Sequence, residues 1–134
     1  MPQAGSASGS AMTWEECLAF VKDTFTSDDS SDIHARLRLD VRGTTHPAMV
    51  WQGKSTAYSS NEVVHIASPI CPVEVGDLAH LARQADEFPL GALRIMSDTV
   101  HIHQALPLTH LETTRLAASI RLIVAEALTL SQEA

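Results

Sequence analysis

The stretch from Val73 to Glu126 decides the fold of this chain. It reads VEVGDLAHLARQADEF, PLGALRIM, SD, TVHIHQAL and PLTHLETTRLAASIRLIVAE in succession. The outer segments carry apolar residues at helical spacing, and the two inner runs are separated only by Ser97-Asp98. Helical periodicity favours helices, and a two-residue connection favours a β-hairpin. The stretch therefore predicts a helix, a tight hairpin and a long second helix.

The expected boundaries follow from these patterns. The first helix should cover residues 75–87, and the hairpin strands should cover residues 92–96 and 99–105. Thr109 and Glu112 have the spacing of a capping box, which predicts that the long helix begins there. Its apolar face should consist of Leu116, Ile120, Ile123, Val124 and Ala127. Its solvent face should carry Arg115, Arg121 and Glu126.

The preceding part of the chain predicts the other half of the same domain. Residues 1–11 are rich in Gly, Ser and Ala, and we expect a disordered lead-in there. Thr13 and Glu16 form a capping box that should start a helix, and residues 26–32 look like a polar loop. The apolar stripe of that helix should consist of Trp14, Cys17, Leu18, Val21 and Phe25.

Three strands are expected between this helix and the stretch that starts at Val73. Apolar and polar residues alternate over residues 33–41, as in a half-buried strand. Residues 46–51 and 62–68 are the next two strands, joined by a polar loop over residues 52–61. The order α-β-β-β-α-β-β-α predicts one α+β domain over residues 12–130, with an antiparallel sheet and helices packed on one face.

Composition limits the classes of partner. The chain has 134 residues, a formal charge of −7 and 45% hydrophobic residues, as in an ordinary globular domain. An acidic balance argues against nucleic acid and anionic membranes, which attract basic faces. Cys17 and Cys71 form no CxxC pair, and the N-terminal pattern predicts no signal peptide. We expect free thiols and a cytoplasmic protein.

The order of elements and three short phrases resemble the type III secretion chaperone-like fold, in its YbjN-type branch of sensory transduction regulator-like proteins. The phrases are VHIASP at residues 64–69, EFPLGAL at residues 87–93 and QALPL at residues 104–108. The resemblance covers about residues 62–128. Residues 88–91 depart from it, because the aromatic and aliphatic residues of the family's turn exchange places there. The resemblance implies a cytosolic homodimer that binds extended segments of partner proteins and has no catalytic residues.

A screen for chemical motifs finds no phosphate-binding, dinucleotide-binding, hydrolase or zincin signature. His101 and His103 share one face of a predicted strand, where two imidazoles can begin a zinc site. Asp98 and His65 are possible further ligands, but their spacing does not fix either one. A polar strand face explains the pair more simply, so we predict no catalytic residues, no cofactor and no metal.

Two surfaces remain as candidate sites. His34, Arg36 and Arg38 form a basic strand face that can hold an anionic small ligand or an acidic segment. The small residues of the helix over residues 75–87 permit close contact with a second copy, and the candidate dimer contacts are Leu78, Ala79, Leu81, Ala82 and Ala85. The main hypothesis is a non-enzymatic, chaperone-like or regulatory module that binds a segment of another protein. The alternatives are a small anionic ligand-binding domain and an unrecognised enzyme.

Overall fold

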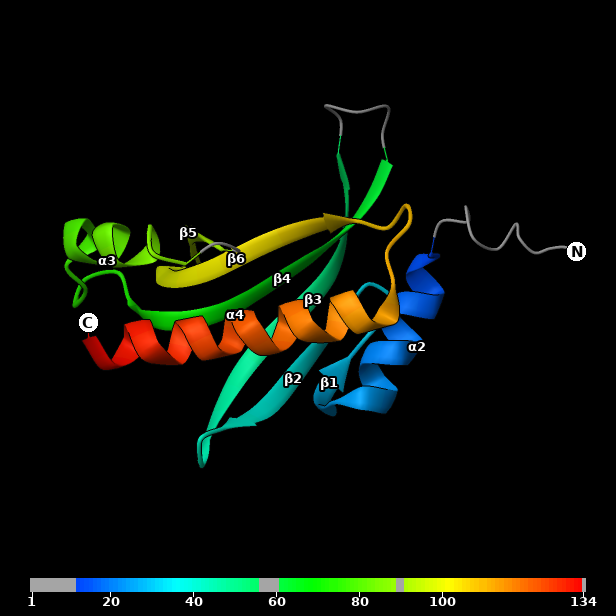
Figure 1. Ribbon diagram of the computed structural model, residues 1–134, viewed down its shortest axis with the longest axis horizontal. Helices are drawn as coiled ribbons and strands as arrows, with labels where there is room; N and C mark the ends of the chain where they lie inside the picture. The colour runs from blue at the N-terminus through cyan, green and yellow to red at the C-terminus, as the bar shows by residue number, and fades with distance from the viewer. Residues whose placement is uncertain (1–11, 56–60, 89–90, 134) are drawn as a thin grey trace, which may run out of the picture.

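The computed structural model describes residues 12–55, 61–88 and 91–133 (Figure 1). The predicted lead-in over residues 1–11 lies outside the described residues. Within the described ranges, six strands form one antiparallel sheet in the order β1-β2-β3-β4-β6-β5, and three helices pack against it. The predicted α+β class, with an antiparallel sheet and helices on one face, is confirmed.

The elements have the following bounds in chain order. They are α2 (Trp14–Thr24), β1 (Thr26–Ser30), β2 (His34–Val41), β3 (Thr44–Ser55), β4 (Asn61–Pro72), α3 (Leu78–Ala85), β5 (Ala92–Met96), β6 (Thr99–Pro107) and α4 (Thr113–Glu133). None of the described helices is long and apolar enough to cross a membrane.

Local sequence signals set several of these boundaries. The capping box that opens α2 is confirmed, because the Glu16 N–H donates to the Thr13 hydroxyl at 3.0 Å and the Thr13 N–H donates to the Glu16 carboxylate at 2.9 Å. The β5–β6 turn is also confirmed: Ser97 and Asp98 both have positive φ, at 50° and 60°. Two such residues in succession make the hairpin turn whose twist matches that of the flanking strands.

The core lies between the sheet and α4. This helix crosses the sheet and contacts β2, β3, β4 and β6 (Figure 1). Strand β2 alternates as expected, with Ala35, Leu37 and Leu39 buried toward the helices. The residues of α4 in the core are Leu116, Ile120, Ile123, Val124, Ala127 and Leu130. A strand with one buried face and one polar face is the form that an antiparallel sheet takes when helices cover one side.

One strand was missed by the sequence pattern. The prediction of a polar loop over residues 26–32 is wrong in part, because Thr26–Ser30 forms β1 and pairs antiparallel with β2. Its sequence, TSDDS, has no apolar alternation, and four of its five residues are exposed. This edge strand pairs with β2 through its backbone. Its Asp28 Oδ1 also contacts Arg38 Nε of β2 at 2.6 Å. Strands β3 and β4 also continue into the predicted 52–61 loop.

The predicted start of the long helix is wrong. Helix α4 begins at Thr113, and the proposed capping box from Thr109 to Glu112 precedes it. His110 has a φ of 60°, which breaks the helical path, while Leu108 and Leu111 are buried and anchor this connection to the core. Burial of two leucines outweighs the local capping signal here.

Two further expectations need correction. Helix α3 is shorter than residues 75–87, because Asp77 caps its start by accepting the His80 N–H at 3.1 Å. Glu126, expected on the solvent face of α4, is only 4% exposed. The two cysteines are free as expected: Cys17 is buried, which raises the pKa of its thiol to about 12, and Cys71 is partly exposed.

Candidate functional site

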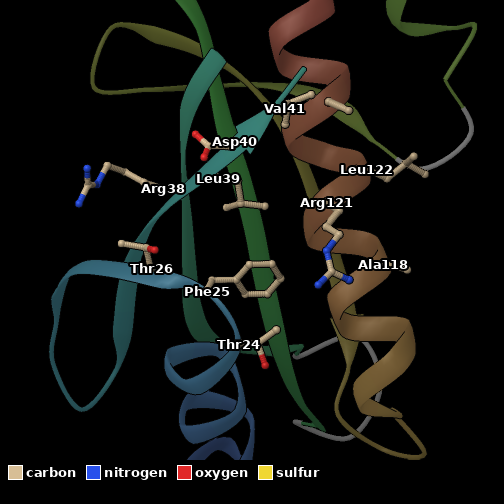
Figure 2. A pocket seen from close by; sticks show the side chains of 11 residues that line it. Thr24, Phe25, Thr26, Arg38, Leu39, Asp40, Val41, Ala118, Arg121 and Leu122 are labelled. Atoms are coloured by element: carbon tan, nitrogen blue, oxygen red, sulfur yellow. The ribbon is translucent and has the colours of Figure 1, made fainter. Parts of the chain in front are cut away.

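A groove of about 690 Å³ lies where the C-terminal end of α2 and the end of β2 face α4 (Figure 2). Its α4 wall consists of Ala118, Arg121, Leu122 and Ala125. Leu122 is 42% exposed, although it is a large apolar residue. The opposite wall contains Phe25, Leu39 and Val41. Apolar side chains that remain open to solvent between two elements are typical of a binding surface.

The shape of the sheet edge produces this groove. Strand β1 pairs with β2 only as far as Thr26 opposite Arg38. The next three residues of β2, Leu39 to Val41, pair on their other side with β3. Their outer edge therefore extends beyond the last residue of β1 that pairs with β2. An uncovered strand edge can accept another extended segment through backbone hydrogen bonds.

The side chain of Phe25 occupies the junction between the two walls. Phe25 is the C-cap of α2 and has extended backbone angles, so the chain leaves the helix there and enters β1. The guanidinium carbon of Arg121 lies 5.2 Å from the centre of the Phe25 ring, and Figure 2 shows this side chain extending from α4 toward the ring. An exposed cation–π contact of this kind contributes about 0.5–1 kcal/mol. It connects the two walls but is weak enough to be exchanged for contacts with a ligand.

Several polar residues at and near the groove are already paired within the chain. Arg38 contacts Asp28 at 2.6 Å, and the Thr45 hydroxyl donates to Asp40 at 2.8 Å. Arg42 donates to the Thr129 hydroxyl at 3.2 Å and ties the β2–β3 turn to α4. Among the described lining residues there is no histidine or cysteine. The arrangement offers apolar contacts and a strand edge, which suit an extended polypeptide.

The predicted basic face has carboxylate neighbours that the sequence did not place. His34, Arg36 and Arg38 share one face of β2, as the alternation predicted. Asp29 lies 3.6 Å from the His34 ring, and Asp28 contacts Arg38. The missed strand β1 supplies both carboxylates. Anion binding at this face stays a prediction, and the two aspartates oppose it by charge repulsion.

The predicted dimer contacts divide into two groups. Leu81 and Ala85 are buried in the core of this chain, at 0% and 8% exposure, and so have little surface to offer a second copy. Leu78, Ala79 and Ala82 are exposed on α3. Helix α3 contacts β5, the outermost strand of the sheet, where Ile95 is 53% exposed. The dimer stays a prediction, now centred on exposed residues at this edge.

The two histidines of the predicted β6 face lie together with residues from other strands. His103 contacts His65 on β4, with 2.9 Å between its Nε2 and the His65 Nδ1. Asp98, the other possible zinc ligand, sits in the β5–β6 turn. Among the described residues no group of three or more His, Cys, Asp and Glu is placed to hold a metal ion. That the protein binds no zinc stays a prediction, which elemental analysis can test.

Sequence reasoning did not identify the groove. Phe25 was assigned to the apolar stripe of the first helix, and Ala118, Leu122 and Ala125 were not singled out. These three residues have the spacing i, i+4, i+7, so they form a second, smaller apolar stripe beside the core stripe of α4. A helix with two apolar stripes has more apolar surface than one sheet covers. That spacing was the available signal.

The fold is similar to that of a solved protein. The chain matches one chain of the HopA1–SchA chaperone–effector complex with a TM-score of 0.56 and 14% sequence identity, over 89% of this chain and 94% of that chain. At this identity the similarity shows the fold. The chaperone-like fold predicted from the order of elements is thereby confirmed.

No protein-family model matches the chain, and no curated protein sequence matches it either. The YbjN-type assignment therefore stays a prediction.

Proposed function

We propose that this protein is a non-enzymatic, chaperone-like module that binds an extended segment of a partner protein. The groove between the free edge of β2 and α4 is the observation that carries the proposal. The segment would add to the β2 edge through backbone hydrogen bonds and place apolar side chains against Leu122 and Phe25. The fold similarity to a chain of a chaperone–effector complex supports this role. We place the protein in the cytoplasm, where newly made partners are available.

The groove proposal predicts a specific loss of partner binding. Leu122→Arg introduces a long cation into the apolar wall and is expected to weaken partner capture at least tenfold, since truncation of a central apolar contact costs about 2 kcal/mol or more. The tagged protein and the variant are compared by quantitative mass spectrometry of proteins captured from the native host lysate.

A matched control separates this effect from general surface disruption. Ile33→Arg places the same charge on another exposed apolar residue, which is 61% exposed and lies outside the groove lining. It is expected to retain the captured partner. Equal capture by wild type and Leu122→Arg would overturn the groove as the binding site, and so would equal loss in both variants.

We also propose that the protein is a homodimer that assembles through α3 and the β5 edge. Leu78 and Ile95 are 39% and 53% exposed there. Light scattering should give about twice the chain mass of 14.5 kDa at micromolar concentration. Leu78→Glu should shift the mass toward one chain, because it places a charge within a self-complementary apolar contact. The control Ile33→Glu should leave the mass unchanged, and a wild-type monomer at all concentrations would contradict the proposal.

A further inference from the structure

The sheet face opposite the helices carries an aromatic and cationic cluster made of Trp51, His65, His103 and Arg94. These residues come from four strands, β3, β4, β6 and β5. The Trp51 and His65 rings stack with their centres 4.9 Å apart and their planes at 11°. The His65 and His103 rings follow with centres 5.1 Å apart and planes at 24°. The guanidinium carbon of Arg94 lies 5.9 Å from the centre of the Trp51 ring. We call this set the open-face cluster.

Hydrogen bonding within the open-face cluster defines which atoms carry protons. His103 Nε2 lies 3.2 Å from Arg94 Nη1 and 2.9 Å from His65 Nδ1. Arginine can only donate, so His103 Nε2 accepts and its ring proton is on Nδ1. His65 then donates from Nδ1 to the same atom. Two donors converge on one imidazole lone pair, and the remaining N–H groups of Arg94 are left for another acceptor.

The surroundings of the cluster contain basic, neutral and acidic groups. Asp28 and Asp29 of β1 line a cavity together with His101, and Asp29 lies 3.6 Å from the His34 ring. His34 on β2 is the register partner of Trp51, and His101 on β6 is the register partner of Arg94. In the described part of the chain, carboxylates form ion pairs only with Arg38 and His34, so none balances Arg94. Burial and the charge of Arg94 lower the pKa of His65, and lower that of His103 to about 4. Burial also lowers the pKa of His101.

Gly53 gives the cluster its shape. A Cβ atom at this position would lie 2.4 Å from His65 Nε2, so a side chain there would collide with the ring. The glycine lets the imidazole lie against the strand and stack on Trp51. The cluster is therefore held in place by backbone shape as well as by its own contacts.

We propose that the open-face cluster binds an oxyanionic group, a carboxylate or a phosphate, through Arg94 with His103, His65 and His101 beside it and Trp51 beneath. A guanidinium offers paired donors that match such groups. An arriving anion reduces the repulsion between Arg94 and a protonated imidazole, so anion binding and protonation of the neighbouring histidines favour each other. Binding therefore tightens as the pH falls. The cluster lies across the sheet from the groove, and the proposal is independent of partner binding there.

The test follows the histidine side chains by nuclear magnetic resonance during titration with inorganic phosphate and, separately, with a triglutamate peptide. Ionic strength is kept constant with chloride. We expect saturable shifts of the His65 and His103 signals with at least one probe, and tighter binding at mildly acidic than at neutral pH. Saturation by phosphate alone indicates a free phosphate ligand, and saturation by the peptide alone indicates an acidic polypeptide; either result supports the site.

Two charge-removing variants make the test specific. Arg94→Gln should weaken binding about tenfold or more, as expected when a charged hydrogen-bond donor is lost. Arg115→Gln removes the same charge from an exposed position on α4, which packs on the other face of the sheet. This variant should bind as wild type does. His103→Phe keeps the ring stack and should lose the pH dependence. The proposal is overturned if neither probe saturates above the chloride background, or if Arg94→Gln and Arg115→Gln have equal effects.

Discussion

Replacement of Trp14 by alanine is expected to lower the free energy of unfolding by about 3–5 kcal/mol, the range for loss of a large buried aromatic side chain. Trp14 is 2% exposed, and its indole N–H donates to the Asp32 carbonyl at 2.6 Å. The substitution leaves a cavity under α2 and an unpaired carbonyl. Urea denaturation followed by far-ultraviolet circular dichroism measures the loss as a lower midpoint with an unchanged slope.

The other tryptophan provides the control. Trp51 is partly exposed on the open face, where it stacks on His65. Trp51→Ala removes one aromatic contact and little core volume, so the expected loss is about 1 kcal/mol. Comparable losses at the two positions would contradict the assignment of Trp14 to the core. Because Phe25 follows α2 directly, Trp14→Ala should also weaken partner capture through the groove.

Replacement of Glu126 by glutamine is expected to raise the free energy of unfolding at neutral pH by about 1–3 kcal/mol, because glutamine cannot ionise and so avoids the cost of burying a charge without a partner. Glu126 is 4% exposed, and among the described residues its Oε2 has no hydrogen-bond partner. Burial raises the pKa of this carboxyl in the folded chain above its unfolded value. The folded chain thus holds the proton more tightly than the unfolded chain does.

The sign of the pH effect follows from this difference. Wild-type stability due to Glu126 is fully present below the unfolded pKa and declines as the pH rises through the higher folded pKa. Glu126→Gln removes the decline, so its advantage should be small in acid and should grow toward neutral pH. Glu87→Gln changes an exposed carboxylate and should stay within about 0.5 kcal/mol of wild type. Denaturation at several pH values would contradict the prediction if the two variants behaved alike.

Much of the fold is encoded in short-range patterns. The alternation of Ala35, Leu37 and Leu39 predicted β2 and its buried face, and the Thr13–Glu16 box predicted the start of α2. The positive φ of Ser97 and Asp98 agrees with the predicted hairpin. In each case the deciding interaction joins residues within one element or one turn. The sequence alone therefore contains the signal.

The errors arose where a long-range interaction decides the structure. Strand β1 is polar and forms by pairing with the edge of β2. The local sequence pattern does not show this pairing. The connection before α4 follows the burial of Leu108 and Leu111, and the Thr109–Glu112 spacing has no effect against it. Glu126 looked solvent-exposed because it is charged, and only the arrangement of α4 on the sheet shows that it is buried.

The candidate site was hidden for the same reason. Its walls come from the end of α2, the end of β2 and the middle of α4, which are distant in sequence. The exposure of Leu122 depends on how α4 lies on the sheet, which local spacing does not show. The i, i+4, i+7 spacing of Ala118, Leu122 and Ala125 indicates extra apolar surface on the helix. It does not show that the surface faces an open strand edge.

The order of the sheet has a consequence for how the protein is made. Strands β1 to β4 pair with their sequence neighbours, and β5 pairs with β6, so most strand contacts are available early during synthesis. Pairing of β4 with β6 joins these units, but α4 follows every strand in the chain. Until the ribosome releases α4, the apolar face that includes Val50, Ile66 and Ile102 has no helix to cover it. The nascent sheet therefore exposes an apolar surface of the kind that promotes aggregation until translation reaches the helix.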